Sequence, residues 1–117
     1  MKPKQQAEQG DDMFRSKLNA IIDMRHPTVM LADKVDWAHL DNEYGALYAE
    51  DGRPGIATRV MVGLHILKHT YALSDEDVCA RWVENPYFQY FTGETYFQHK
   101  LPIDRSSMDE PLAQTHR

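Results

Sequence analysis

The sequence predicts an all-α fold, a small bundle of about five helices with a central helix-turn-helix-like hairpin. Three observations support this prediction. Apolar residues recur at intervals of three and four in several segments, which is the spacing of one helical face. Capping residues and prolines divide these segments into short pieces. The alternation of apolar and polar residues that would mark a strand does not extend beyond a few residues.

Length and composition indicate one small domain. The chain has 117 residues, of which 42% are hydrophobic, enough for a core. Its formal net charge of -5 argues mildly against an autonomous nucleic-acid binder and against a basic membrane-surface helix. Cys79 is the one cysteine, so no intramolecular disulfide can form. Because no signal peptide or transmembrane segment is recognisable, we expect a cytoplasmic protein with no membrane partner.

The N-terminal half contains three predicted helices. Residues 1–10 are polar and are expected to form a disordered tail. A first helix is expected from Asp11 to about Arg25, because Pro27 follows closely. Pro27 itself can begin the second helix, and Asp36 can cap a third that ends in the turn before Gly52. The apolar face of the first helix consists of Phe14, Leu18, Ile21 and Ile22.

The predicted hairpin follows a Gly-Arg-Pro-Gly turn. Thr58 is expected to cap a long, mostly apolar helix whose apolar run ends at Leu73. Ser74 then caps a second helix, and Asn85-Pro86 stops it. An aromatic turn over 86–91 is expected next, with Gly93 in a left-handed conformation and a loop or short extended piece over 94–104.

The segment from about Phe14 to Met108 resembles the N-terminal domain of bacterial insertion-sequence transposases of the InsH-like (IS-five) family. The matching residues are His26-Pro27, Leu31-Ala32-Asp33-Lys34, Asp36-Trp37, Gly52-Arg53-Pro54-Gly55, Thr58-Arg59, Met61-Val62-Gly63-Leu64, Leu67-Lys68-His69, Leu73-Ser74-Asp75-Glu76, Arg81-Trp82-Val83-Glu84-Asn85-Pro86-Tyr87, Gln89-Tyr90-Phe91, Tyr96-Phe97-Gln98-His99 and Leu101-Pro102-Ile103-Asp104. The resemblance implies that residues 11–104 form a helical domain for DNA binding and assembly. It also implies that strand transfer belongs to a separate ribonuclease-H-like domain, in which an Asp-Asp-Glu triad holds two metal ions.

The resemblance ends at the C-terminal segment. Family members continue past the serine pair into a basic stretch, whereas this chain reads Asp109-Glu110-Pro111 after Met108. We therefore expect residues 105–117 to be a divergent, disordered tail. The expected protein is a truncated transposase domain that has no catalytic residues and is not an enzyme.

The resemblance places four candidate DNA-binding residues in or near the hairpin. Positive side chains there could contact phosphates, which fix register without reading sequence. Solvation or pairing with Asp75, Glu76 or Glu84 is the alternative. The four candidates are Arg53, Arg59, Lys68 and Arg81.

Other chemical interpretations are weaker. His65 and His69 share a helical face, but the glutamate of a zinc-binding H-E-x-x-H motif is absent, so we expect no metal and no cofactor. Cys79 is expected in the core rather than as a nucleophile. The acidic cluster Asp33, Asp36, Asp41 and Glu43 is expected to be solvated. Packing, rather than base stacking, is expected for Trp82, Tyr87, Phe88, Tyr90, Phe91, Tyr96 and Phe97.

Two functions from different classes follow. The first is a transposase N-terminal module that binds transposon-end DNA weakly and self-associates. The second is an interaction module that pairs with an intact, full-length transposase and inhibits it. An unrelated small metalloenzyme is a third alternative.

Overall fold

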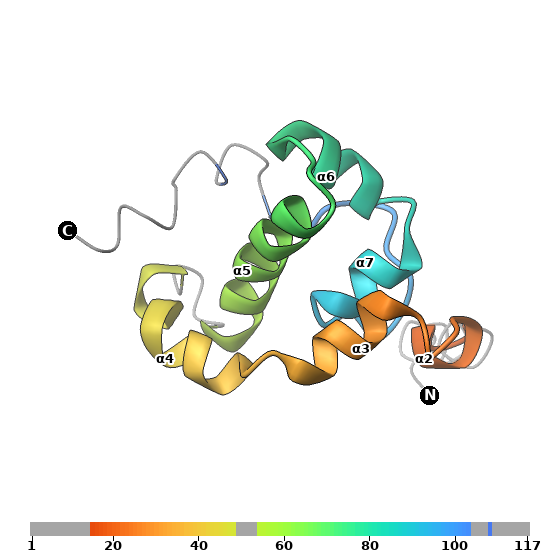
Figure 1. Cartoon of the computed structure of the whole chain (residues 1–117), viewed down its shortest axis with the longest axis horizontal. Coiled ribbons are helices and arrows are strands. Elements are labelled where there is room, and N and C mark those ends of the chain that lie inside the picture. The colour runs from red at the N-terminus through yellow and green to blue at the C-terminus, as the bar shows by residue number, and fades with distance from the viewer. Residues whose placement is uncertain (1–14, 49–53, 104–107, 109–117) are drawn as a thin grey trace, which may run out of the picture.

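The computed structural model describes residues 15–48, 54–103 and Met108. Over these residues the chain is all-α, as the sequence predicts, and an isolated Lys17–Tyr96 bridge is the only extended pairing. The helices are α2 (Leu18–Ile21), α3 (Pro27–Lys34), α4 (Trp37–Tyr48), α5 (Pro54–Thr70), α6 (Asp75–Trp82) and α7 (Pro86–Phe91) (Figure 1). The predicted tails at 1–10 and 105–117, apart from Met108, lie outside this part of the chain, as do Phe14 and Arg53.

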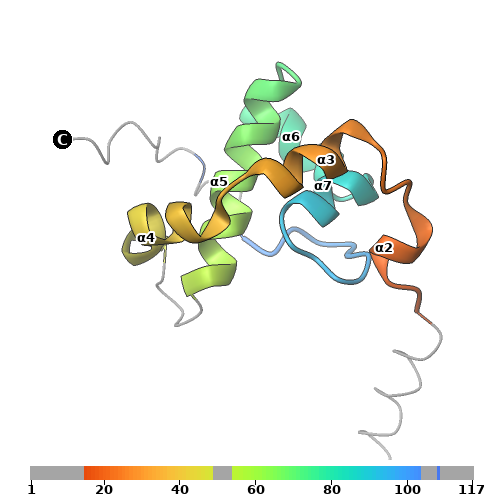
Figure 2. The ribbon, with the colours of Figure 1, turned by 60° about the horizontal axis from the view of Figure 1, so that its bottom comes forward.

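Helix α5 is the centre of the bundle. In Figures 1 and 2 it runs between α4 on one side and the group of α3, α6 and α7 on the other. The core gathers on its buried face, where Leu64 and Leu67 are fully enclosed. The buried core cluster consists of Ala32, Val60, Met61, Leu64, Leu67, Val78, Cys79, Trp82, Phe88, Phe91 and Met108.

The start of α5 differs from the prediction. The helix begins at Pro54, and the expected cap Thr58 lies in its interior, where it is buried. Proline suits the first position of a helix because its missing N–H would have no partner there and its φ angle is already helical. The expected Gly-Arg-Pro-Gly turn is thus partly the first turn of the helix.

The turn between α5 and α6 closes the predicted hairpin. Helix α5 ends at Thr70, three residues before the expected Leu73, because Ala72 adopts a left-handed φ of 56°. The Leu73 N–H then donates to the Lys68 carbonyl at 2.8 Å, and the Ala72 N–H to that of His69 at 3.4 Å, which is a Schellman arrangement. The predicted Ser74 cap is confirmed, since its Oγ accepts from the Asp77 N–H at 3.0 Å.

The first described helix is shorter than predicted. Helix α2 ends at Ile21 rather than near Arg25, and Ile21 is 57% exposed instead of lying on the buried face. Long-range contacts override the helical pattern here. The Leu18 N–H donates to the Thr95 carbonyl at 2.8 Å, and the Asp23 N–H donates to the Tyr87 hydroxyl at 2.9 Å.

The next two helices follow their predicted caps. Helix α3 begins at Pro27, and His26 caps it by accepting from the Thr28 N–H through Nδ1 at 3.1 Å. At the start of α4, Asp36 Oδ1 accepts from the His39 N–H at 3.1 Å, as expected for its N-cap.

The expected aromatic turn over 86–91 is instead helix α7. Asn85 caps it through two hydrogen bonds, to the Tyr87 and Phe88 N–H groups at 2.8 and 3.2 Å. Gly93 follows with a φ of 98°, which confirms the predicted left-handed position. The two buried rings, Phe88 and Phe91, are three residues apart, which is the spacing of one helical face.

Candidate nucleic-acid interface

Arg59 is built into the fold by two contacts. Its Nε donates to the Phe91 carbonyl at 3.1 Å, and its guanidinium lies over the Trp37 ring with Cζ 4.4 Å from the ring centroid. The side chain also passes next to Gly93, where an added Cβ would lie 3.0 Å from Arg59 Cδ. Half-burial lowers the pKa of Arg59 because desolvation disfavours the charged form.

Lys68 forms an ion pair with an acidic side chain. Its Nζ lies 2.7 Å from Asp75 Oδ1, across the turn between α5 and α6. This pairing is the alternative that the sequence left open, and it leaves less of the lysine charge for a phosphate. The same contact helps to hold the end of α5 against the first turn of α6.

Arg81 lies in the last turn of α6 and is exposed. It forms no ion pair with another residue of the described ranges. Of these three candidates, Arg59 and Lys68 contact other parts of the protein, whereas Arg81 faces solvent. Arg53 lies outside the described residues.

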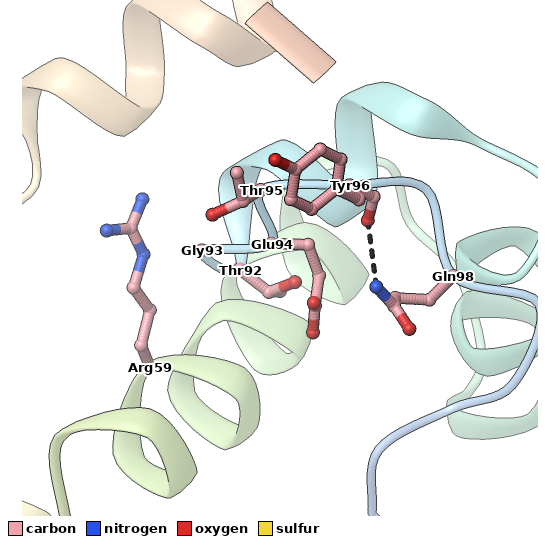
Figure 3. Close-up of a pocket in the computed structure, with 7 residues that line it drawn as sticks. All are labelled: Arg59, Thr92, Gly93, Glu94, Thr95, Tyr96 and Gln98. Carbon is pink, nitrogen blue, oxygen red and sulfur yellow. Dashed lines mark hydrogen bonds between the residues drawn. The ribbon is translucent and has the colours of Figure 1, made fainter. Parts of the chain in front are cut away.

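A cleft adjoins Arg59, and no pattern in the sequence indicated it. Its volume is about 390 Å³, and it lies between α5 and the loop that follows α7 (Figure 3). The residues that line it are Arg59, Thr92, Gly93, Glu94, Thr95, Tyr96 and Gln98.

Hydrogen bonds from a buried glutamine fix the wall of this cleft. Gln89 is fully buried; its Nε2 donates to the Gln98 carbonyl at 2.8 Å, and its Oε1 accepts from the Gln98 N–H at 2.6 Å. The Glu94 N–H donates to the Gln89 carbonyl at 3.0 Å. The loop over 94–98 is thus tied to α7 at both ends, so the cleft is largely preformed.

A carboxyl group lies in the cleft, and a cation lies over its aromatic ring. Glu94 is half-buried, and desolvation raises the pKa of its carboxyl group. Arg15 lies over the Tyr96 ring, with Cζ 4.7 Å from the ring centroid. Neither Arg15, Glu94 nor Tyr96 was among the predicted site residues, since only folding brings Arg15 and Arg59 close to the segment of Glu94 and Tyr96.

The remaining candidates take structural positions. His65 is buried on α5, whereas His69 is exposed, and no group of three metal-ligating side chains forms among the residues described. Cys79 is buried in the core with its Sγ 3.4 Å from Met108 Sδ. Within the acidic cluster, Asp33, Asp36 and Glu43 are exposed as predicted, and Asp41 is half-buried.

Most of the aromatic group packs as predicted. Trp82, Phe88 and Phe91 are buried, and Tyr87 stacks on His26 with ring centroids 3.9 Å apart. No described helix is long and apolar enough to cross a membrane.

Comparison with known proteins identifies the family. Residues 16–110, which include every described helix, match the model of the family described as transposase domain (DUF772). The chain belongs to this family. It is also 51% identical over 108 residues to a Rhizobium meliloti protein described as "uncharacterized protein ORF8 in nfe locus".

The transposase domain accounts for part of that relative. The alignment covers 92% of this chain and 52% of the relative, so the chain spans about half the length of the curated protein that it matches. No solved structure matches the chain.

Proposed function

We propose that this transposase domain is the N-terminal DNA-binding and assembly module of an insertion-sequence transposase of the InsH-like (IS-five) group, acting in the bacterial cytoplasm. The match of the family model to residues 16–110 carries the proposal, because it covers the whole described bundle. Motifs on both helices of the hairpin carry the finer resemblance to this group, including Thr58-Arg59 on α5 and Arg81-Trp82 on α6.

The proposed DNA contacts are to phosphates. Arg81 is exposed and can reach a phosphate without losing another contact. Arg59 keeps two terminal amino groups that make no hydrogen bond to another described residue, while Nε anchors the side chain. Lys68 is expected to contribute less, because Asp75 already pairs with it. Arg53 is also a proposed phosphate contact, because of its position in the sequence next to the hairpin.

The test is a binding titration with duplexes that carry the terminal inverted repeats flanking the gene, read by fluorescence anisotropy. Arg81→Ala should weaken binding uniformly across sequences and reduce the salt slope by about one. Lys68→Ala is the comparison, with a smaller expected effect. Unchanged affinity and slope in Arg81→Ala would show that α6 does not face DNA.

A second candidate function is pairing with an intact transposase and inhibition of its assembly. It is favoured by three large apolar side chains that are exposed on α2, α3 and the turn between them. Ile21 is 57%, Met24 44% and Met30 50% exposed. When such side chains lie together on one face, they form the kind of apolar patch that another protein covers.

Light scattering after size exclusion tests whether this surface joins copies of the chain. A chain that self-associates through this surface should become monomeric when Ile21 and Met30 are changed to Lys and Glu, with DNA affinity unchanged. If parent and variant have the same mass, the surface is not an interface between copies.

We further propose that the 117-residue chain does not catalyse strand transfer, since the resemblance assigns the metal-binding triad to a different domain. Purified protein should not nick supercoiled DNA with magnesium or manganese. Metal-dependent nicking that disappears when one carboxylate of this chain is changed would contradict this.

A further inference from the structure

The cleft beside α5 contains two charged groups that do not neutralise each other. Arg59 and Glu94 both line it, yet they form no ion pair, and the Glu94 carboxylate makes no hydrogen bond to another described residue. Half-buried charges usually find partners, because desolvation is otherwise costly. One preformed cleft thus carries a cation and an anion that are not paired with each other. This arrangement indicates a ligand that carries a complementary group for each.

Arg59 is held in the orientation of an anion receptor. The Phe91 carbonyl accepts from Nε and the Trp37 ring supports the guanidinium face, so the planar group is fixed. The two terminal amino groups then present a rigid fork, and a fork of this kind matches the geometry of a phosphate.

Glu94 supplies the opposite requirement. A carboxylate accepts hydrogen bonds from amino groups, such as the exocyclic amines of cytosine, adenine and guanine. Tyr96 adds an aromatic ring to the same cleft, with Arg15 over the ring. Aromatic rings bind unpaired bases by stacking.

We propose that this cleft binds one unpaired nucleotide at a DNA end, with its phosphate at Arg59, its base at Tyr96 and a base amino group at Glu94. This inference rests on the proposed function, and it adds a binding site that none of the four predicted basic residues defines alone. A volume of about 390 Å³ suits a single nucleotide and is too small for a duplex. Thymine has no exocyclic amine, so it should be the weakest of the four bases.

The test compares one short duplex in three forms: blunt, with a single-stranded cytosine overhang and with a single-stranded thymine overhang. Overhangs of both polarities are used, and affinities are measured by fluorescence anisotropy with the full chain. The cytosine overhang should bind about tenfold more tightly than the blunt duplex, from stacking and hydrogen bonding of one base. The thymine overhang should gain less.

Variants assign the effect to the cleft. Glu94→Gln should remove the preference for cytosine over thymine, because an amide both donates and accepts. Glu84→Gln makes the same charge change on an exposed residue outside the cleft and should preserve the preference. Tyr96→Leu should remove most of the gain from either overhang. Circular dichroism melts check that each variant is folded.

The outcomes separate this inference from the proposed function. Equal binding of blunt and overhang duplexes would overturn the cleft site and leave the DNA-binding module in place. A cytosine preference that survives Glu94→Gln would also overturn the cleft site. Failure to bind any of the three forms would overturn both.

Discussion

At the residue scale, Trp82 combines a buried apolar ring with one polar contact. The side chain is fully buried, and its Nε1 donates to Thr92 Oγ1 at 2.8 Å, which links α6 to the end of α7. Trp82→Ala should lower the free energy of unfolding by about 3–5 kcal/mol, a large fraction of a small domain's stability. Urea unfolding followed by circular dichroism measures this.

Trp82→Phe is the matched control, because it keeps an aromatic ring and removes the indole N–H. Thr92 Oγ1 also lies 3.1 Å from the Gln89 carbonyl and 3.3 Å from that of Phe88, so it keeps a hydrogen bond when the indole is lost. The phenylalanine variant should therefore cost less than the alanine variant. Coincident unfolding curves for Trp82→Ala and the parent would contradict the central place of this residue.

His65 should make stability depend on pH. It is 6% exposed, and its Nε2 makes no hydrogen bond to another described residue. Desolvation lowers the pKa of His65; Lys68 and His69 act in the same direction, and Asp75 opposes them. The unfolded chain takes up a proton as the pH falls through the ordinary histidine range near 6.5, whereas the folded chain resists it. The stability contribution is thus complete above about pH 6.5 and is lost below it, with a slope of at most about 1.4 kcal/mol per pH unit.

The measurement compares unfolding free energies at about pH 7.5 and about pH 5.5. His65→Leu should reduce the difference between the two values, because no buried imidazole remains to be protonated. His69→Gln changes an exposed histidine one turn along the same helix and should leave the difference as in the parent. If both variants match the parent, His65 is not the group responsible.

The sequence predicted which residues share a helical face better than it predicted which residues form a site. Val78 and Trp82 were assigned to the core because their spacing repeats that of a helix, and both are fully buried. The cleft was not predicted, because Arg59 comes from α5 and Glu94 from a loop without periodicity. Periodicity shows which residues of one element share a face, but it does not show which elements meet.

At the element scale, Gly63 sets the approach of α5 to α7. A Cβ at this position would lie 2.9 Å from Thr92 Cγ2 and 3.6 Å from Phe91 Cδ2, so the helices would have to separate. Gly63→Ala should destabilise the domain by about 1–3 kcal/mol, although a glycine-to-alanine change inside a helix otherwise stabilises it. A lower urea midpoint for Gly63→Ala would support this packing role, whereas a higher midpoint would contradict it.

Gly45→Ala is a useful comparison for Gly63→Ala. A Cβ at Gly45 would lie 2.9 Å from Asp41 Oδ1, which is the end of a side chain that can rotate away. The change in α4 should therefore be neutral or stabilising. If both variants are destabilised equally, the close approach of α5 to α7 is not the reason for the effect at Gly63.

Element boundaries were predictable where a side chain caps a helix. Ser74 and Asp36 cap as expected, because a side-chain oxygen satisfies a free N–H group of the first turn. Thr58 is also a common capping residue, but the helix already begins at Pro54, so Thr58 lies inside it. The end of α2 is set by hydrogen bonds to Thr95 and Tyr87, residues distant in sequence, so no local pattern could fix it.

At the scale of the whole molecule, charge opposes the proposed DNA binding. The formal net charge is -5, whereas a protein gains affinity for DNA by replacing counterions at phosphates. Binding of duplex DNA by this chain should therefore be weak at physiological salt and nearly independent of the duplex sequence. The resemblance further suggests that the segment after the serine pair carries basic residues in other members, and Asp109-Glu110 stands there in this chain.

Reversing this local charge should strengthen DNA binding. Asp109→Arg combined with Glu110→Arg should raise affinity and steepen the dependence on salt by up to about two phosphate contacts. Asp11→Arg combined with Asp12→Arg makes the same change in net charge at the other end of the chain and is the matched control. Anisotropy titrations with one duplex over a series of salt concentrations measure both. A larger slope for the C-terminal pair alone would place the DNA beside the segment that follows Met108, whereas equal slopes for the two pairs would show that only the overall charge of the molecule matters.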